Sequence, residues 1–269
     1  MSNDAAAFVG NAPQVYDRDV GPVLFVDYAE DLARRVAVLS PKRVLETAAG
    51  TGIVTRRLYN ILPPGAHVTA TDLNPPMLAL ARSKFAPGDA VTFQEADATA
   101  LPFPDGSFDA VVCQFGVMFF PDKAKSYAEA HRVLAPGCSY LFNVWDSLNH
   151  NPPARISHEL LTALFRNDPP DIYRVAFTYH SIDAIKDALT AAGFVDLRVS
   201  VTGRVKEVAD IGRFARAVVY GNPAADQIKA RGGDPEAMVA ALNGAYRREF
   251  GENPSRIPIQ AILFEALRP

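Results

Sequence analysis

The chain has 269 residues, of which 49% are hydrophobic and 21% charged, and its formal net charge is −3. This composition is typical of a globular protein, and the length suits one large domain or a domain with a sizeable insertion. There is no run of basic residues, which argues against a nucleic acid or an anionic membrane as partner. No apolar run reaches the roughly 18 residues that span a bilayer, and the N-terminus lacks the features of a signal peptide. We therefore expect a cytoplasmic protein. The two cysteines lack the spacing of metal ligands, so we expect no metal site.

Short apolar segments alternate with helical patterns through the first three quarters of the chain. Between residues 23 and 39, apolar residues recur at the spacing of one helical face. The following segments are predicted, in order, as strand 43–46, helix 52–61, strand 66–71, helix 75–84, strand 90–94, strand 108–114, helix 122–134, strand 139–145, helix 181–192 and strand 195–202. This alternation indicates parallel βαβ units and an α/β fold.

Two segments interrupt the alternation. Residues 147–180 form an irregular patch that contains "NHNPP" and "NDPPD". Residues 203–255 predict two or three helices, and a last strand follows at about 257–266. Open α/β sheets bind ligands at the carboxyl ends of their strands. We therefore expect both segments to lie over that edge of the sheet.

The stretch "VLETAAGTG", residues 44–52, joins the first predicted strand to a helix through a turn of small residues. Gly50 and Gly52 suit a sharp bend or the close approach of a ligand, and Ala48 is small enough to lie nearby. The dinucleotide fingerprint G-x-G-x-x-G fits in neither possible frame. Glu46 would repel a pyrophosphate but suits a ligand with a cationic ammonium group. The alternative is an ordinary strand–helix turn with an incidental glutamate.

Two further carboxylates follow at the ends of predicted strands. Asp72 ends the second strand, where an acidic residue can accept hydrogen bonds from both ribose hydroxyls, although "DLNPP" is also typical of a surface turn. Asp97 follows the third strand and could accept from an adenine amino group, while the Ala98 amide donates to a ring nitrogen. Glu46, Asp72 and Asp97 thus match the amino, ribose and adenine parts of one ligand, S-adenosylmethionine.

These segments resemble class I S-adenosylmethionine-dependent methyltransferases of the UbiE-like group, which act on small molecules. The resemblance covers about residues 43–145, through "VLETAAGTG", "ATDLNPPML", "EADATALPFPDGSFDAVVCQFGVMFFPD" and "EAHRVLAPGCSYLFNVW". It implies an α/β Rossmann-like sheet of seven strands in the order 3-2-1-4-5-7-6, with strand 7 antiparallel and a helical insertion between strands 6 and 7. Ala48 departs from the family, which usually has glycine at this position.

The resemblance also implies a division of the chain into four parts. We expect an N-terminal helical segment over the cofactor site, a cofactor-binding core, a helical cap and a final core strand. The predicted boundaries are 1–40, 41–202, 203–256 and 257–269.

By the same resemblance, the turn and the neighbouring strand ends bind the cofactor, which leaves as S-adenosylhomocysteine, and Leu73 and Phe115 enclose the adenine ring. The predicted cofactor-binding residues are Glu46, Ala48, Gly50, Thr51, Gly52, Asp72, Leu73, Met77, Asp97, Ala98, Gln114 and Phe115. One motif, "NPPM" at 74–77, resembles the signature of enzymes that methylate amino groups on bases. In those families it follows the fourth strand, whereas here it follows the second. We assign Asn74 as a helix N-cap, with the prolines in the first helical turn.

The substrate side is less defined, because methyl transfer from a sulfonium is an in-line displacement that mainly requires alignment of the reactants. Aromatic residues suggest a partly apolar acceptor, and the predicted substrate residues are Tyr16, Trp145, Phe177 and Tyr179. A base is needed only if the nucleophile arrives protonated with a high pKa. The candidates for this role are Asp146, His150 and His180, and the alternative for each histidine is a surface loop position.

The sequence therefore favours a methyltransferase that acts on O, N or C of a small organic acceptor, as a monomer or homodimer. A non-catalytic protein that binds S-adenosylmethionine, as a sensor or partner subunit, is the first alternative, because methyl transfer leaves no obligatory catalytic residue to find. An NAD-dependent oxidoreductase is the second. It also uses an acidic residue after the second strand, but the glycine pattern, Glu46 and Asp97 argue against it.

Overall fold

The computed structural model describes residues 10–252 and 254–269, and its centre is a seven-stranded sheet. The strand order is β3-β2-β1-β4-β5-β7-β6, as predicted. Strands β1 (Arg43–Glu46), β2 (His67–Asp72), β3 (Val91–Glu95), β4 (Phe108–Gln114) and β5 (Leu134–Trp145) pair in parallel. The Gly137 amide donates to Arg268 and the Asp146 amide donates to Gln260, so β7 (Ser255–Leu267) runs antiparallel to β5.

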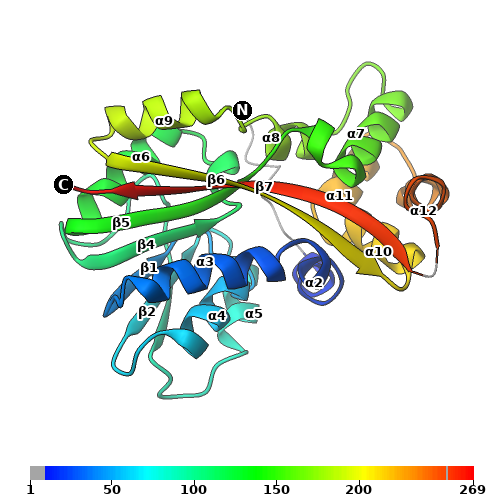
Figure 1. The fold of residues 1–269 in the computed structure, drawn as a ribbon. Coiled ribbons are helices and arrows are strands. Elements are labelled where there is room, and N and C mark those ends of the chain that lie inside the picture. Colours follow the sequence, from blue (N-terminus) through cyan, green and yellow to red (C-terminus); the bar gives the residue numbers. More distant parts are fainter. Residues whose placement is uncertain (1–9, 253) are drawn as a thin grey trace. The chain divides into compact units, whose positions relative to one another are not determined.

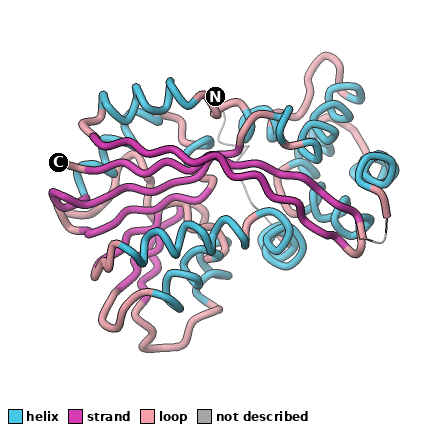
Figure 2. The backbone as a smooth tube through the Cα atoms, viewed as in Figure 1, coloured by secondary structure: helices cyan, strands magenta, loops and turns pink. Residues whose placement is uncertain are grey.

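The chain divides into two compact units. Unit 1 comprises Met1–Phe25, Trp145–Tyr179 and Thr202–Ala261, and unit 2 comprises Val26–Val144, His180–Val201 and Ile262–Pro269. The boundary falls within β7 and within its neighbour β6 (Val195–Val208), the two long strands that lie side by side in Figure 2.

Unit 2 holds the parallel strands and the helices that cover them. Helix α3 (Val26–Val38) packs beside α4 (Ile53–Ile61), and α6 (Lys123–Val133) packs beside α9 (Ile182–Ala191). Figure 1 shows these two pairs on opposite sides of the sheet. The remaining helix, α5 (Pro75–Arg82), contacts β2 and β3.

The core of unit 2 is rich in aromatic side chains. Phe142 stacks between Tyr140 and Phe264, with ring centroids 4.8 Å and 5.1 Å away. The His131 ring meets Phe194 edge-on, with ring centroids 5.1 Å apart. These rings come from β5, β7, α6 and the turn after α9, so they join segments that are distant in the sequence.

Unit 1 is mainly helical. Its elements are α1 (Ala12–Val15), the π-helical turn η2 (Tyr16–Val20), α2 (Gly21–Leu24), η4 (Leu148–His150), α7 (Pro152–Leu164), α8 (Ile172–Phe177), α10 (Ile211–Tyr220), α11 (Ala224–Ala230) and α12 (Pro235–Phe250). Helix α12 packs against α7 and α10, where Tyr246 stacks with Phe214. The three helices α10–α12 confirm the helical content predicted between the last two strands, which Figure 1 shows in gold to orange.

Three local predictions were wrong. The patch 147–180 contains α7 and α8 rather than irregular chain, because Pro152 and Pro153 occupy the first helical turn, where proline is tolerated. Strand β6 continues to Val208 instead of ending at 202, since alternating exposure persists through Gly203. The helix expected over 23–39 is interrupted at Phe25, between α2 and α3. The prolines at 152 and 153 were interpreted as a break, although a helix can begin at proline. Gly203 was interpreted in the same way, although the edge strand β6 continues through it.

Within residues 10–252 and 254–269, no helix combines the length and the apolar character needed to cross a bilayer. Residues 1–9 of the predicted N-terminal segment lie outside the described part of the chain.

Candidate functional site

The turn between β1 and α4 is built on left-handed backbone conformations. Gly50 and Gly52 have φ values of +55° and +77°, which explains the need for glycine. Ala48 also has a positive φ, +52°, a conformation that alanine adopts at a cost. Ala48 thus replaces the family's glycine at a position where the backbone keeps the left-handed conformation that favours glycine.

The methyl group of Ala48 lies against a second glycine. A Cβ atom placed on Gly116 would lie 2.5 Å from Ala48 Cβ and 2.8 Å from Cys113 Sγ. Gly116 follows Phe115, whose φ is +53°, so the ends of the neighbouring strands β1 and β4 both carry a non-glycine residue in the left-handed region. Such backbone strain is found most often where a ligand binds.

This contact predicts a coupled pair of mutations. Gly116→Ala should lower the free energy of unfolding by about 1–3 kcal/mol, the usual cost of overpacking a core. Adding Ala48→Gly should restore part of the loss, because it removes the nearer of the two clashing atoms. Urea unfolding of the single and double variants measures this. Gly244→Ala in α12 is the control, since its nearest neighbour is the flexible end of Arg248 at 3.4 Å. Equal losses in the single and double variants would show that the two positions do not interact.

Glu46 lies at the end of β1 with only 2% of its surface exposed. The Thr55 hydroxyl donates to its carboxylate at 2.6 Å, and the Thr71 hydroxyl donates to its carbonyl oxygen at 3.0 Å. Burial raises the pKa of Glu46 to about 8; the Thr55 hydrogen bond opposes this shift and the charge of Asp72 adds to it. At neutral pH the buried carboxyl is therefore mostly protonated, and it can become an anion when a cation is placed beside it.

Asp72, at the end of β2, is bonded to the backbone of two turns. One oxygen accepts from the Gly50 amide at 2.8 Å, and the other accepts from the Asn74 amide at 2.8 Å. Burial raises the pKa of Asp72, and the amides of Asn74, Gly50 and Leu73 act in the opposite direction. Asp72 therefore fixes the glycine turn as well as being a predicted ribose partner. Asn74 is at the N-cap position of α5, as predicted, with prolines after it.

The register of the sheet brings the other predicted cofactor residues to the same edge. Glu46 lies opposite Ala70 and Val112, so β2 and β4 extend two residues beyond it, to Asp72 and Gln114. Asp72 lies opposite Glu95, the last residue of β3. Asp97 accepts from the amide and hydroxyl of Thr99, both at 2.8 Å. The remaining predicted residues on this edge are Thr51, Leu73, Met77, Ala98, Gln114 and Phe115. Leu73 is 52% exposed, whereas Phe115 is buried edge-on against Tyr28.

The predicted substrate residues lie in unit 1, where three of them form an aromatic row. Tyr16 stacks on Phe25 at 5.0 Å, Phe25 lies 5.8 Å from Trp145, and Trp145 stacks on Phe177 at 5.7 Å. Tyr16 also belongs to a π-helical turn, a feature frequent at functional sites. Tyr179 follows α8 at the end of the same segment.

Of the three candidate bases, Asp146 and His150 lie in unit 1, and His180 lies in unit 2. Asp146 already accepts from the Ser147 amide at 2.6 Å and from Gln260 Nε2 at 2.7 Å. The sequence analysis missed Gln260, because a lone glutamine in a strand carries no signal; its importance depends on pairing with a residue more than a hundred positions away.

A comparison with protein families finds that the model described as "Methyltransferase domain" matches residues 45–142. This segment holds β2 to β4, parts of β1 and β5, and every predicted cofactor-binding residue. The fold and the strand order are those of class I methyltransferases, and residues 45–142 match the methyltransferase domain.

Among curated proteins, demethylmenaquinone methyltransferase of Thermus thermophilus is 53% identical over 110 residues, which are 40% of this chain and 48% of that protein. The chain thus spans about half the length of the curated relatives it matches. The matched segment is thus similar to part of UbiE-type methyltransferases, and these findings support S-adenosylmethionine as the cofactor.

Two solved structures show how widely the fold is used. The YcgJ protein of Bacillus subtilis aligns with a TM-score of 0.59 and 20% identity, over 90% of this chain and 98% of that chain. The [4+2]-cyclase SpnF aligns with a TM-score of 0.55 and 20% identity, over 90% of this chain and 81% of that chain. At these identities the likeness concerns the fold alone.

Proposed function

We propose that this protein transfers the methyl group of S-adenosylmethionine to an O, N or C atom of a small organic acceptor. The observation that carries the proposal is the alignment of Glu46, the glycine turn and Asp72 at one edge of the parallel sheet. The match of the methyltransferase domain to this same segment supports it.

In the proposed mechanism the protein's own groups bind and orient the reactants. Asp72 would accept hydrogen bonds from the ribose hydroxyls, and the Glu46 carboxyl would ionise beside the ammonium group. The cofactor supplies an activated methyl group. The remaining rate enhancement comes from alignment and exclusion of water rather than from an obligatory base.

The acceptor of the named relatives is not carried over to this chain. The predicted substrate residues Tyr16, Trp145, Phe177 and Tyr179 all lie outside residues 45–142, the segment matched by the methyltransferase domain. We propose a small, partly apolar acceptor on the basis of the aromatic row. We also propose that the protein acts as a monomer or a homodimer.

A non-catalytic protein that binds the cofactor, as a sensor or partner subunit, is the second candidate. It stays a candidate because methyl transfer requires alignment of the reactants and leaves no obligatory catalytic residue in the site. Turnover separates the two: a methylated product requires consumption of S-adenosylmethionine and release of S-adenosylhomocysteine in equal amounts.

A thermal-shift titration with S-adenosylmethionine, S-adenosylhomocysteine and NAD tests the cofactor assignment. A ligand that binds only the folded state raises the melting temperature by mass action. We expect both adenosyl ligands to raise it and NAD to leave it unchanged. A shift with NAD alone would replace the proposal with the oxidoreductase alternative.

A further inference from the structure

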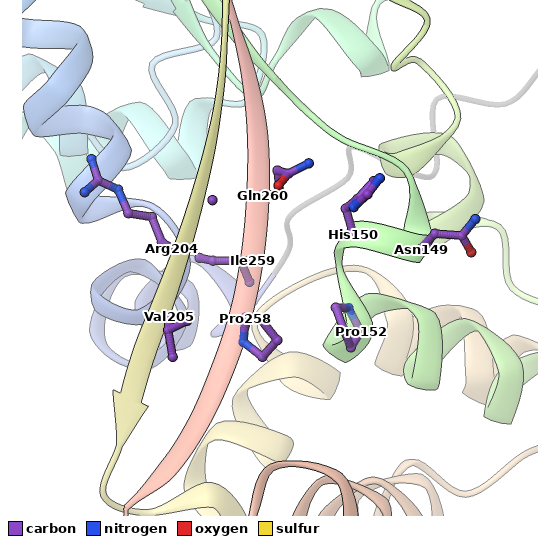
Figure 3. Close-up of a pocket in the computed structure, with 9 residues that line it drawn as sticks. Asn149, His150, Pro152, Arg204, Val205, Pro258, Ile259 and Gln260 are labelled. Atoms are coloured by element: carbon purple, nitrogen blue, oxygen red, sulfur yellow. The ribbon is translucent and has the colours of Figure 1, made fainter.

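A cavity of about 380 Å³ lies within unit 1, between the paired strands β6 and β7 and the segment around η4. Nine residues line it, and Figure 3 draws them: Asn149, His150, Pro152, Gly203, Arg204, Val205, Pro258, Ile259 and Gln260. Of the nine, only His150 has a role predicted from the sequence, as a candidate base.

The strands present one face to this cavity. A Cβ atom on Gly203 would lie 3.4 Å from Gln260 Oε1, which places both residues on the same face. Because side chains alternate along a strand, Val205 and Pro258 share that face and Arg204 points to the other. Figure 3 shows Gln260 and Pro258 on the side of β7 toward His150 and Pro152, with Arg204 extending away from them.

The side chain of Gln260 is held in one orientation. Its Nε2 donates to Asp146 Oδ2 at 2.7 Å, and a carboxylate can only accept, so the nitrogen must face Asp146. The backbone is fixed as well, since the Gln260 amide donates to Asn151 Oδ1 and its carbonyl accepts from Asn151 Nδ2, both at 3.0 Å. The Oε1 atom is therefore presented to the cavity above Gly203.

The lining defines the ligand chemistry. Gln260 Oε1 accepts a hydrogen bond, the His150 imidazole can donate or accept, and Pro152, Pro258 and Val205 provide apolar walls. Of the described residues that line the cavity, only Arg204 carries a permanent charge, and it faces away. Gly203 keeps the floor open, because a larger side chain there would occupy the space in front of Gln260.

We propose that this cavity binds an uncharged, partly apolar molecule with a hydroxyl group, which donates a hydrogen bond to Gln260 Oε1. Asp146 is a positioning residue in this site, because it determines which end of the carboxamide faces the ligand. The proposal goes beyond methyl transfer and stands whether the ligand is the acceptor or a separate effector.

Two probes that differ in one hydrogen-bond donor test the proposal: 1-naphthol and 1-methoxynaphthalene, titrated into the full-length protein by calorimetry. We expect 1-naphthol to bind about five-fold more tightly, the equivalent of one net hydrogen bond of about 1 kcal/mol. Gln260→Leu should abolish the preference, and Asp146→Asn should reduce it while 1-methoxynaphthalene binding is kept. Gly203→Val should weaken the binding of both probes.

Gln94→Leu makes the same chemical change on β3 of unit 2 and should bind both probes as the wild type does. Circular dichroism and the melting temperature establish that each variant is folded. The absence of a preference in the wild type, its persistence in Gln260→Leu, or unchanged binding in Gly203→Val would each overturn the proposal. Mass spectrometry after addition of S-adenosylmethionine then identifies a bound probe as acceptor if it gains a methyl group, and as effector if it does not.

Discussion

Glu46→Gln should make the stability of the protein less dependent on pH. The pKa of Glu46 is raised from its usual 4.5 to about 8 by burial, so the folded state holds a proton that the unfolded state has released. The favourable contribution of this group is complete below pH 4.5 and is lost as the pH rises to about 8. The loss amounts to about 5 kcal/mol, at about 1.4 kcal/mol for each pKa unit.

Urea unfolding at intervals from pH 5 to pH 9 measures this loss. The wild type should become progressively less stable relative to Glu46→Gln, which keeps the shape of the side chain but cannot ionise. Groups that do not interact with Glu46 titrate equally in both proteins, so the difference between the two curves reports on Glu46 together with Asp72, whose charge acts on it. Parallel curves across the range would show that Glu46 is ionised in the folded protein.

The same variant tests the predicted contact with the cofactor. A cationic ammonium group beside Glu46 favours the carboxylate, so binding should release a proton and affinity should increase up to about pH 8. Calorimetry in buffers of different ionisation enthalpy detects that proton. An equal pH dependence of binding in Glu46→Gln would mean that Glu46 does not meet the ammonium group.

Asp72→Ala should weaken the binding of S-adenosylmethionine by roughly 1.5–3 kcal/mol, the value of lost charge-assisted hydrogen bonds. It should also lower the melting temperature, because the Gly50 and Asn74 amides lose the carboxylate that they donate to. Calorimetric titration of S-adenosylhomocysteine and thermal unfolding measure the two effects separately.

Asp89→Ala is the matched control for this variant. Asp89 also bonds a backbone amide, that of Ala86, and the Tyr59 hydroxyl, but it follows α5 and is not a predicted cofactor residue. It should lose stability and keep its affinity for the cofactor. Unchanged affinity in Asp72→Ala would remove Asp72 from the site, even if that variant melts earlier.

The features that could be predicted from the sequence are those set by residues close together in the chain. The strand ends at Glu46 and Asp72 and the glycine turn could be located because apolar periodicity and glycine positions act over a few residues. The complete strand order required the family resemblance. The helical segment that begins at Pro152 was missed because a pair of prolines is compatible with both a break and a helix start.

Contacts between distant segments could not be predicted. The fixed orientation of Gln260 depends on Asp146 and Asn151, and the close approach of Ala48 to Gly116 depends on how two neighbouring strands end. The hydrogen bond from the Gly50 amide to Asp72 is another contact of this kind, because it joins the end of β2 to the turn after β1. A single sequence carries no pattern that reports such pairings.

The boundary between the two units within β6 and β7 has a consequence for the way this protein can be divided. A fragment limited to residues 45–142 would lack the Phe264 ring that stacks on Phe142, and it would leave β5 as an unprotected edge. Each unit is assembled from three separated stretches of chain, so no single cut releases either one intact. The segment shared with the relatives is therefore not expected to fold by itself. A chimera that exchanges it between proteins would also need the two long strands β6 and β7.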